Sequence, residues 1–123
     1  MPVKVVDASA IGALVFGEPA AEEVAAKLSA ATLAAPALLA FEIANIAVKK
    51  LRRHPDQRDA LLAGHALFDR LSIEIVAVDS AAVVNVAEET GLTAYGASYL
   101  WLARELRVAL VTLDAALAVA AGS

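Results

Sequence analysis

The chain has no cysteine among its 123 residues, so disulfide bonds and thiolate metal sites are excluded. Long hydrophobic runs are also absent: the two longest stretches without a charged residue, Leu28–Phe41 and Thr90–Ala103, contain 14 residues each. A membrane-spanning helix needs about 18–20 apolar residues. The first apolar run is interrupted by Asp7, and no cleavage pattern of a secretory signal follows it. We therefore expect a cytoplasmic protein with no membrane partner.

Aromatic residues are scarce, at 5%, and neither sign of charge dominates the chain. Fourteen acidic residues against ten basic ones give a net charge of −4, so any contact with nucleic acid has to come from a local basic patch. Hydrophobic residues, mostly small, are abundant: they make up 60% of the chain, and the mean hydropathy is +0.68. This composition predicts one compact domain over residues 1–123, with apolar surface left for a homodimer.

Short apolar runs alternate with amphipathic segments along the whole chain. Strands are expected at Val3–Val6, Thr32–Ala35, Ile73–Val78 and Val108–Thr112. Helices are expected over residues 8–16, 20–30, 37–53, 56–71, 80–89, 95–106 and 115–121. Strands separated by helices predict a three-layer α/β/α domain, with a parallel sheet of four to five strands between the helices.

Two aspartates occupy equivalent places after apolar strands. Asp7 follows Val3–Val6, and Asp114 follows the run that ends at Leu113. If the two strands are parallel neighbours, both carboxylates lie at the carboxyl edge of the sheet, where open α/β sheets bind ligands. The alternative is that each aspartate only caps the helix that follows it, which is a common role for aspartate.

A third carboxylate, Glu42, stands in an otherwise apolar helical stretch whose neighbours, such as Phe41, are expected to be buried. Buried carboxylates are costly unless they are paired or bound to a cation. Helical spacing puts Glu42, Asn45 and Lys49 on one face. The basic side chains of Lys49, Lys50, Arg52 and Arg53 then suit an RNA phosphate track, or else a solvated helix C-terminus.

With these residues in place, the chain resembles the PIN-domain proteins, specifically the VapC-type toxins of toxin–antitoxin pairs. The resemblance covers nearly the whole chain and rests on four motifs in order. They are Val5–Ala10, Ala35–Asn45, Thr93–Ala103 and Leu110–Asp114.

The resemblance implies a metal-dependent endoribonuclease that uses Mg²⁺ or Mn²⁺ to hydrolyse RNA. By position, Asp7, Glu42 and Asp114 correspond to the acids of the metal site, and Ser9 and Thr112 to hydroxyls that orient them. The family further implies a homodimer and a cognate VapB-type antitoxin that fills the site.

The chain departs from the family pattern at Gly96, where the third motif carries an aspartate. A hard cation prefers oxygen ligands, so the loss of one carboxylate weakens the metal site while the fold survives. We therefore expect an attenuated or inactive toxin. The alternative is a PIN-like binding module that engages antitoxin or RNA without cutting. If the acids are only helix caps, no divalent ion should raise the melting temperature.

Overall fold

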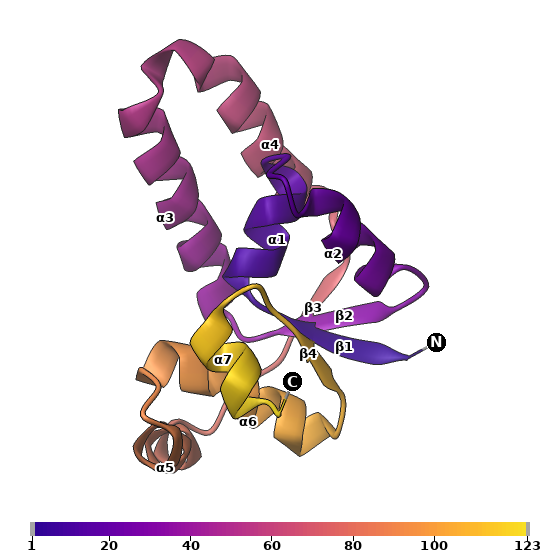
Figure 1. Cartoon of the computed structure of the whole chain (residues 1–123), viewed down its shortest axis with the longest axis vertical. Helices are drawn as coiled ribbons and strands as arrows, with labels where there is room; N and C mark the ends of the chain where they lie inside the picture. Colours follow the sequence, from indigo (N-terminus) through magenta and orange to yellow (C-terminus); the bar gives the residue numbers. More distant parts are fainter. Residues whose placement is uncertain (1, 123) are drawn as a thin grey trace.

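The computed structural model describes residues 2–122, which form a four-stranded sheet between two groups of helices (Figure 1). The strands are β1 (Val3–Val6), β2 (Thr32–Ala35), β3 (Ile73–Ile75) and β4 (Ala109–Val111). The helices are α1 (Ala8–Val15), α2 (Ala21–Leu28), α3 (Leu38–Arg53), α4 (Arg58–Arg70), α5 (Ser80–Thr90), α6 (Ala94–Leu106) and α7 (Ala115–Ala120), with a 3₁₀ turn at Pro55–Gln57.

All strand pairs are parallel, and the strand order is β3-β2-β1-β4. The predicted three-layer architecture with a parallel sheet is confirmed. β1 lies between β2 and β4, so both of its edges are paired, and helices cover both faces of the sheet. Val5 and Val6 are fully buried. This position explains why β1 reads as a continuous apolar run rather than an alternating one.

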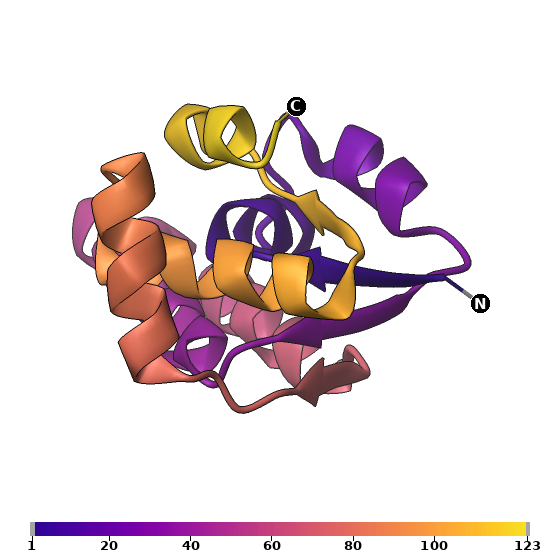
Figure 2. The same cartoon turned by 90° about the horizontal axis from the view of Figure 1, so that it is seen from below.

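The helices divide between the two faces of the sheet (Figures 1 and 2). Helix α1 packs against α2, α3 and α4, while α6 packs against β1, β4, α5 and α7. The largest fully buried side chains come from both groups and from β1: Ile11, Leu39, Ile43, Leu102, Val5, Val6 and Val24. The apolar core therefore fixes α1, α3 and α6 around the end of β1.

Strand β3 is shorter than the expected Ile73–Val78 because its neighbour ends first. β2 stops at Ala35, since Pro36 has no N–H to continue the ladder, and the last bond runs from the N–H of Val76 to the carbonyl of Ala35. Beyond Val76 the chain has no strand to pair with, and it leaves the sheet to enter α5.

Two further expectations need correction. The helix expected over 56–71 begins with a 3₁₀ turn, because Pro55 stands at its start, and becomes α-helical at Arg58. Phe41 was expected to be buried, but 77% of its surface is exposed, since this position of α3 faces away from α1 and the sheet. Within residues 2–122, no helix is long and apolar enough to cross a bilayer.

Candidate active site

The candidate site lies where the connections of the sheet change direction. From β1 the chain crosses to β2 on one side, whereas β4, reached last, pairs with β1 on the other side. Such a switch point leaves a crevice outside the carboxyl ends of the two strands, where α/β proteins place ligands. Asp7 directly follows β1, and Asp114 lies three residues after β4.

Asp7 is a buried carboxylate held by four hydrogen bonds. It caps α1 by accepting the N–H of Ala10 at 3.0 Å, and it accepts the Ser9 hydroxyl at 2.8 Å and 3.0 Å through its two oxygens. The Thr112 hydroxyl donates to Asp7 Oδ2 at 2.5 Å. Because the register sets Val6 opposite Val111, Thr112 comes next to Asp7 across the strand pair. Ser9 and Thr112 therefore fix the orientation of this carboxylate.

Burial raises the pKa of Asp7 above its ordinary value, although the hydrogen bonds from Thr112, Ala10 and Ser9 oppose this change. The negative charge of Asp114 raises the pKa further. The structure thus keeps a carboxylate where its charge is unfavourable, and brings a second one close to it. Clusters of this kind occur at functional sites, where a bound cation or substrate relieves the repulsion.

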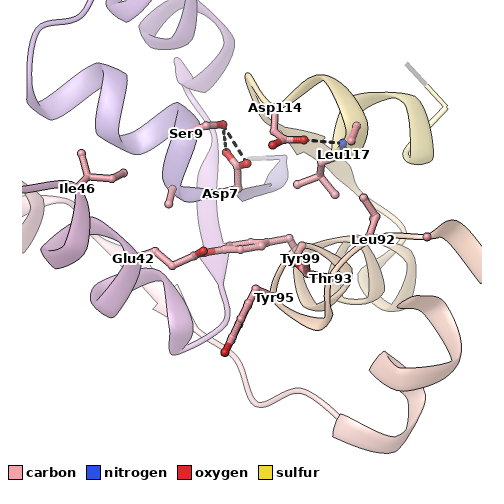
Figure 3. A pocket seen from close by; sticks show the side chains of 14 residues that line it. Asp7, Ser9, Glu42, Ile46, Leu92, Thr93, Tyr95, Tyr99, Asp114 and Leu117 are labelled. Atoms are coloured by element: carbon pink, nitrogen blue, oxygen red, sulfur yellow. Dashed lines mark hydrogen bonds between the residues drawn. The ribbon is translucent and has the colours of Figure 1, made fainter. Parts of the chain in front are cut away.

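Asp114 caps α7 by accepting the N–H of Leu117 at 2.8 Å through Oδ1. Its side chain is solvent-exposed and lies on the rim of the site opposite Asp7 (Figure 3). Both aspartates thus cap helices, as the alternative reading of the sequence held, and both also line one cavity. Capping occupies one oxygen of each carboxylate, and both side chains still line the cavity.

Glu42 reaches the same site from α3 and is half-buried. Its Oε1 accepts the Tyr99 hydroxyl at 2.5 Å. Burial raises the pKa of Glu42, the Tyr99 hydrogen bond opposes this change, and the charge of Asp7 adds to it. Tyr99 was not predicted as a site residue, although it lies three residues after Gly96, on the same helical face.

One cavity of about 520 Å³ joins these side chains (Figure 3). It is lined by Asp7, Ala8, Ser9, Glu42, Ile46, Gly91, Leu92, Thr93, Tyr95, Gly96, Tyr99, Asp114, Ala116 and Leu117. Its acids come from three segments that are far apart in the sequence, and its opposite wall is the start of α6. The topology therefore brings together the three predicted acids.

Gly96 lies in this wall, in the first turn of α6, where its N–H donates to the Thr93 hydroxyl at 3.2 Å. A Cβ added here would meet Thr93 Oγ1 at 3.7 Å and Leu92 Cβ at 3.9 Å, both ordinary van der Waals contacts. Neither backbone conformation nor space requires glycine at this position. A larger side chain would project beside the acidic cavity without disturbing the helix.

The remaining predicted residues lie outside this cavity. Asn45 is exposed and does not line it; Ile46, one full turn after Glu42, does. Lys49, Lys50 and Arg53 line a separate cavity at the end of α3. Lys50 forms an ion pair with Glu18, with 2.9 Å between Nζ and Oε2, and its Nζ lies 5.7 Å from the centre of the Phe16 ring. Arg52 is exposed.

Within residues 2–122, no three histidine, cysteine, aspartate or glutamate side chains form a ready-made metal cluster. The donor chemistry nevertheless fits a hard divalent cation, since Asp7, Glu42 and Asp114 supply only carboxylate oxygens to one cavity. Burial raises the pKa values of Asp7 and Glu42, and the charge of Asp114 adds to the rise at Asp7 and the charge of Asp7 to the rise at Glu42. A bound cation would offset this repulsion between carboxylates.

The sequence model of the PIN domain matches residues 4–123. Among solved structures, the chain is similar to PAE2754 from Pyrobaculum aerophilum, with a TM-score of 0.77 and 29% sequence identity. The alignment covers 97% of this chain and 84% of that one. No curated protein matches the chain significantly. On the family match, which extends over nearly its whole length, the chain belongs to the PIN-domain family.

Proposed function

We propose that this protein is a VapC-type endoribonuclease toxin, dependent on Mg²⁺ or Mn²⁺, whose cleavage of RNA is attenuated or abolished by Gly96. PIN domains are generally metal-dependent nucleases, and the fold agrees. The observation that carries the proposal is the convergence of Asp7, Glu42 and Asp114 on one cavity whose facing wall contains Gly96.

In this proposal, Asp7 and Asp114 hold the cation at the strand ends and Glu42 faces them from α3. A bound Mg²⁺ or Mn²⁺ supplies charge neutralisation at the phosphate and lowers the pKa of an attacking water. Ser9 and Thr112 keep Asp7 oriented through the hydrogen bonds described above. An aspartate at position 96 would add a fourth carboxylate from α6, and its absence weakens the hold on the cation.

The partners follow from the same proposal. RNA is the substrate, and the exposed basic side chains Lys49, Arg52 and Arg53 at the end of α3 offer phosphate contacts beyond the acidic cavity. A VapB-type antitoxin would occupy the site, and a homodimer would cover part of the exposed apolar surface, to which Phe41, Ile75 and Tyr95 contribute.

A second candidate function is a module that binds RNA or antitoxin without cutting. It is favoured by one observation: the described acids do not form a group of three that could hold a metal ion. The two functions differ in what restoring the carboxylate would do. A degenerate binding module does not cut RNA even with an aspartate at position 96, whereas an attenuated nuclease recovers cleavage.

The test compares the unmodified chain with Gly96→Asp on a pool of cellular RNA in the presence of Mn²⁺. We expect Gly96→Asp to cut and the unmodified chain to cut weakly or not at all, with EDTA abolishing cleavage by either protein. Gly96→Asn, which fills the same space without a charge, is the matched control and should remain inactive. Folded protein that cuts in none of these forms would refute the nuclease and favour binding.

A further inference from the structure

Tyr99 forms the floor of the acidic cavity and joins two helices that meet there. It belongs to α6, only 2% of its surface is exposed, and its hydroxyl reaches across to Glu42 on α3 (Figure 3). The contact links residues 57 positions apart in the sequence, with 2.5 Å between the phenol oxygen and Glu42 Oε1. Such a contact depends on how the fold places α3 relative to α6.

The hydroxyl of Tyr99 acts as a donor. Burial raises the pKa of Tyr99, and its hydrogen bond with Glu42 and the negative charges of Glu42 and Asp7 raise it further. A phenol is protonated at neutral pH, so the Tyr99 O–H donates a hydrogen bond to the Glu42 carboxylate oxygen. Among the described residues, no other group donates a hydrogen bond to the carboxylate of Glu42.

Glu42 needs such a restraint more than the two aspartates do. Asp7 and Asp114 have short side chains that are fixed by the helices they cap. A glutamate has one more rotatable bond and loses more conformational freedom when its carboxylate is held in one place. The single bond from Tyr99 thus decides where this carboxylate lies.

We propose that Tyr99 is a positioning residue, whose hydroxyl holds the Glu42 carboxylate toward Asp7 and the cavity so that it can take part in binding a divalent cation. This inference rests on the proposed metal site and adds a residue to it. Groups that hydrogen-bond to metal ligands commonly change metal affinity 10- to 100-fold when they are removed.

The test measures Mn²⁺ affinity by electron paramagnetic resonance, without RNA, in the Gly96→Asp protein. Tyr99→Phe keeps the ring that packs in the core and removes only the hydroxyl. We expect Mn²⁺ binding about 10-fold weaker than in Gly96→Asp alone. Ser98→Ala is the matched control: Ser98 stands next to Tyr99 on α6, its hydroxyl donates to the Tyr95 carbonyl at 2.6 Å, and it does not line the acidic cavity, so its loss of a hydroxyl should leave the affinity unchanged.

A double-mutant cycle shows whether Tyr99 acts through Glu42. In a Glu42→Gln background, adding Tyr99→Phe should cause no further loss of Mn²⁺ affinity. An equal loss in both backgrounds would overturn the inference, since Tyr99 would then act on the fold as a whole. Unchanged affinity in Tyr99→Phe would overturn it as well.

The outcomes also separate this inference from the proposed function. If Gly96→Asp binds Mn²⁺ and Tyr99→Phe has no effect, the metal site stands and the positioning role falls. If neither the unmodified chain nor Gly96→Asp binds Mn²⁺, the proposed metal site and the positioning role are both refuted. A circular dichroism spectrum of each variant confirms that the affinities compare folded proteins.

Discussion

At the scale of single residues, the site contains carboxylates whose burial costs free energy. Asp7 is 5% exposed, and burial raises its pKa in spite of hydrogen bonds from Ser9, Thr112 and Ala10. A carboxyl group whose folded pKa is raised binds protons more readily in the folded state than in the unfolded one. It therefore favours folding at acid pH, and this contribution is lost as the pH rises through the folded pKa.

Asp7→Asn is accordingly expected to stabilise the metal-free protein at neutral pH. The amide fills the same space without a charge, and the Ser9 and Thr112 hydroxyls can rotate to suit it. The gain in the free energy of unfolding should be about 0.5–2 kcal/mol, as for other substitutions that relieve a functional site. It should shrink as the pH falls below the folded pKa. Urea unfolding over a series of pH values, with EDTA present, measures this difference.

An Asp7→Asn protein that is less stable than the unmodified chain at every pH would contradict this account. It would mean that the hydrogen bonds donated by Ser9 and Thr112 to the second carboxylate oxygen outweigh the cost of burying the charge. Ser80→Ala gives a comparison outside the site, because it changes an exposed residue at the start of α5 and should not alter the pH dependence of stability.

The site residues that could be predicted are those whose role is set by local sequence. Asp7 and Asp114 each follow an apolar strand, and parallel strands bring their carboxyl ends to one edge. Tyr99 could not be predicted in its role, because its partner Glu42 is brought to it by helix packing. Asn45 was expected in the site from spacing alone, but which side of α3 faces the cavity depends on its rotation against α1.

At the scale of elements, the glycines of two helices show what packing demands. A Cβ at Gly64 in α4 would come within 2.8 Å of the Val15 carbonyl oxygen and 3.0 Å of Phe16 Cδ1, so α4 needs glycine to lie against the end of α1. The corresponding contacts at Gly96 are 3.7 Å or longer. Packing therefore requires glycine at position 64, whereas position 96 has room for a larger side chain.

We therefore expect opposite effects from the same substitution. Gly64→Ala should lower the free energy of unfolding by about 1–3 kcal/mol, because a backbone atom has to move. Gly96→Ala should be neutral or stabilising by up to about 1 kcal/mol, since alanine is the better helix former. Chemical denaturation of the two variants tests this, and a large loss at Gly96 would show that glycine serves the fold there.

The elements themselves could largely be predicted, because strands and helices in this chain are marked by apolar runs, prolines and caps. All four strands lie within or at their expected ranges. The end of β3 could not be predicted, because it depends on where its neighbour stops pairing. The exposure of Phe41 also escaped prediction, since it depends on how α3 is turned toward its neighbours.

At the scale of the whole molecule, α3 and α4 form an arm that extends away from the sheet (Figure 1). Its tip carries the basic side chains of Lys49, Arg52 and Arg53, which are exposed in a protein of net charge −4. If RNA lies along this arm, replacing these three residues by alanine should weaken its binding at all sequences. The slope of log affinity against log salt should fall by about 2 for single-stranded RNA.

Filter binding of a short single-stranded RNA at several salt concentrations, with EDTA present, measures this slope. The control variant removes the same charge elsewhere, with Lys27, Arg70 and Arg104 replaced by alanine. A slope that falls equally in both variants would show that RNA responds to the overall charge and not to the arm.

The central claim is that Asp7, Glu42 and Asp114 form a divalent-cation site that lacks one ligand at position 96. Mn²⁺ affinity tests it most directly, because it does not depend on knowing which RNA is cut. We predict that Gly96→Asp binds one Mn²⁺ at least about 10-fold more tightly than the unmodified chain or Gly96→Asn, and that Asp7→Asn abolishes this binding. Equal affinities in the aspartate and asparagine variants, or binding unaffected by the loss of Asp7, would contradict it.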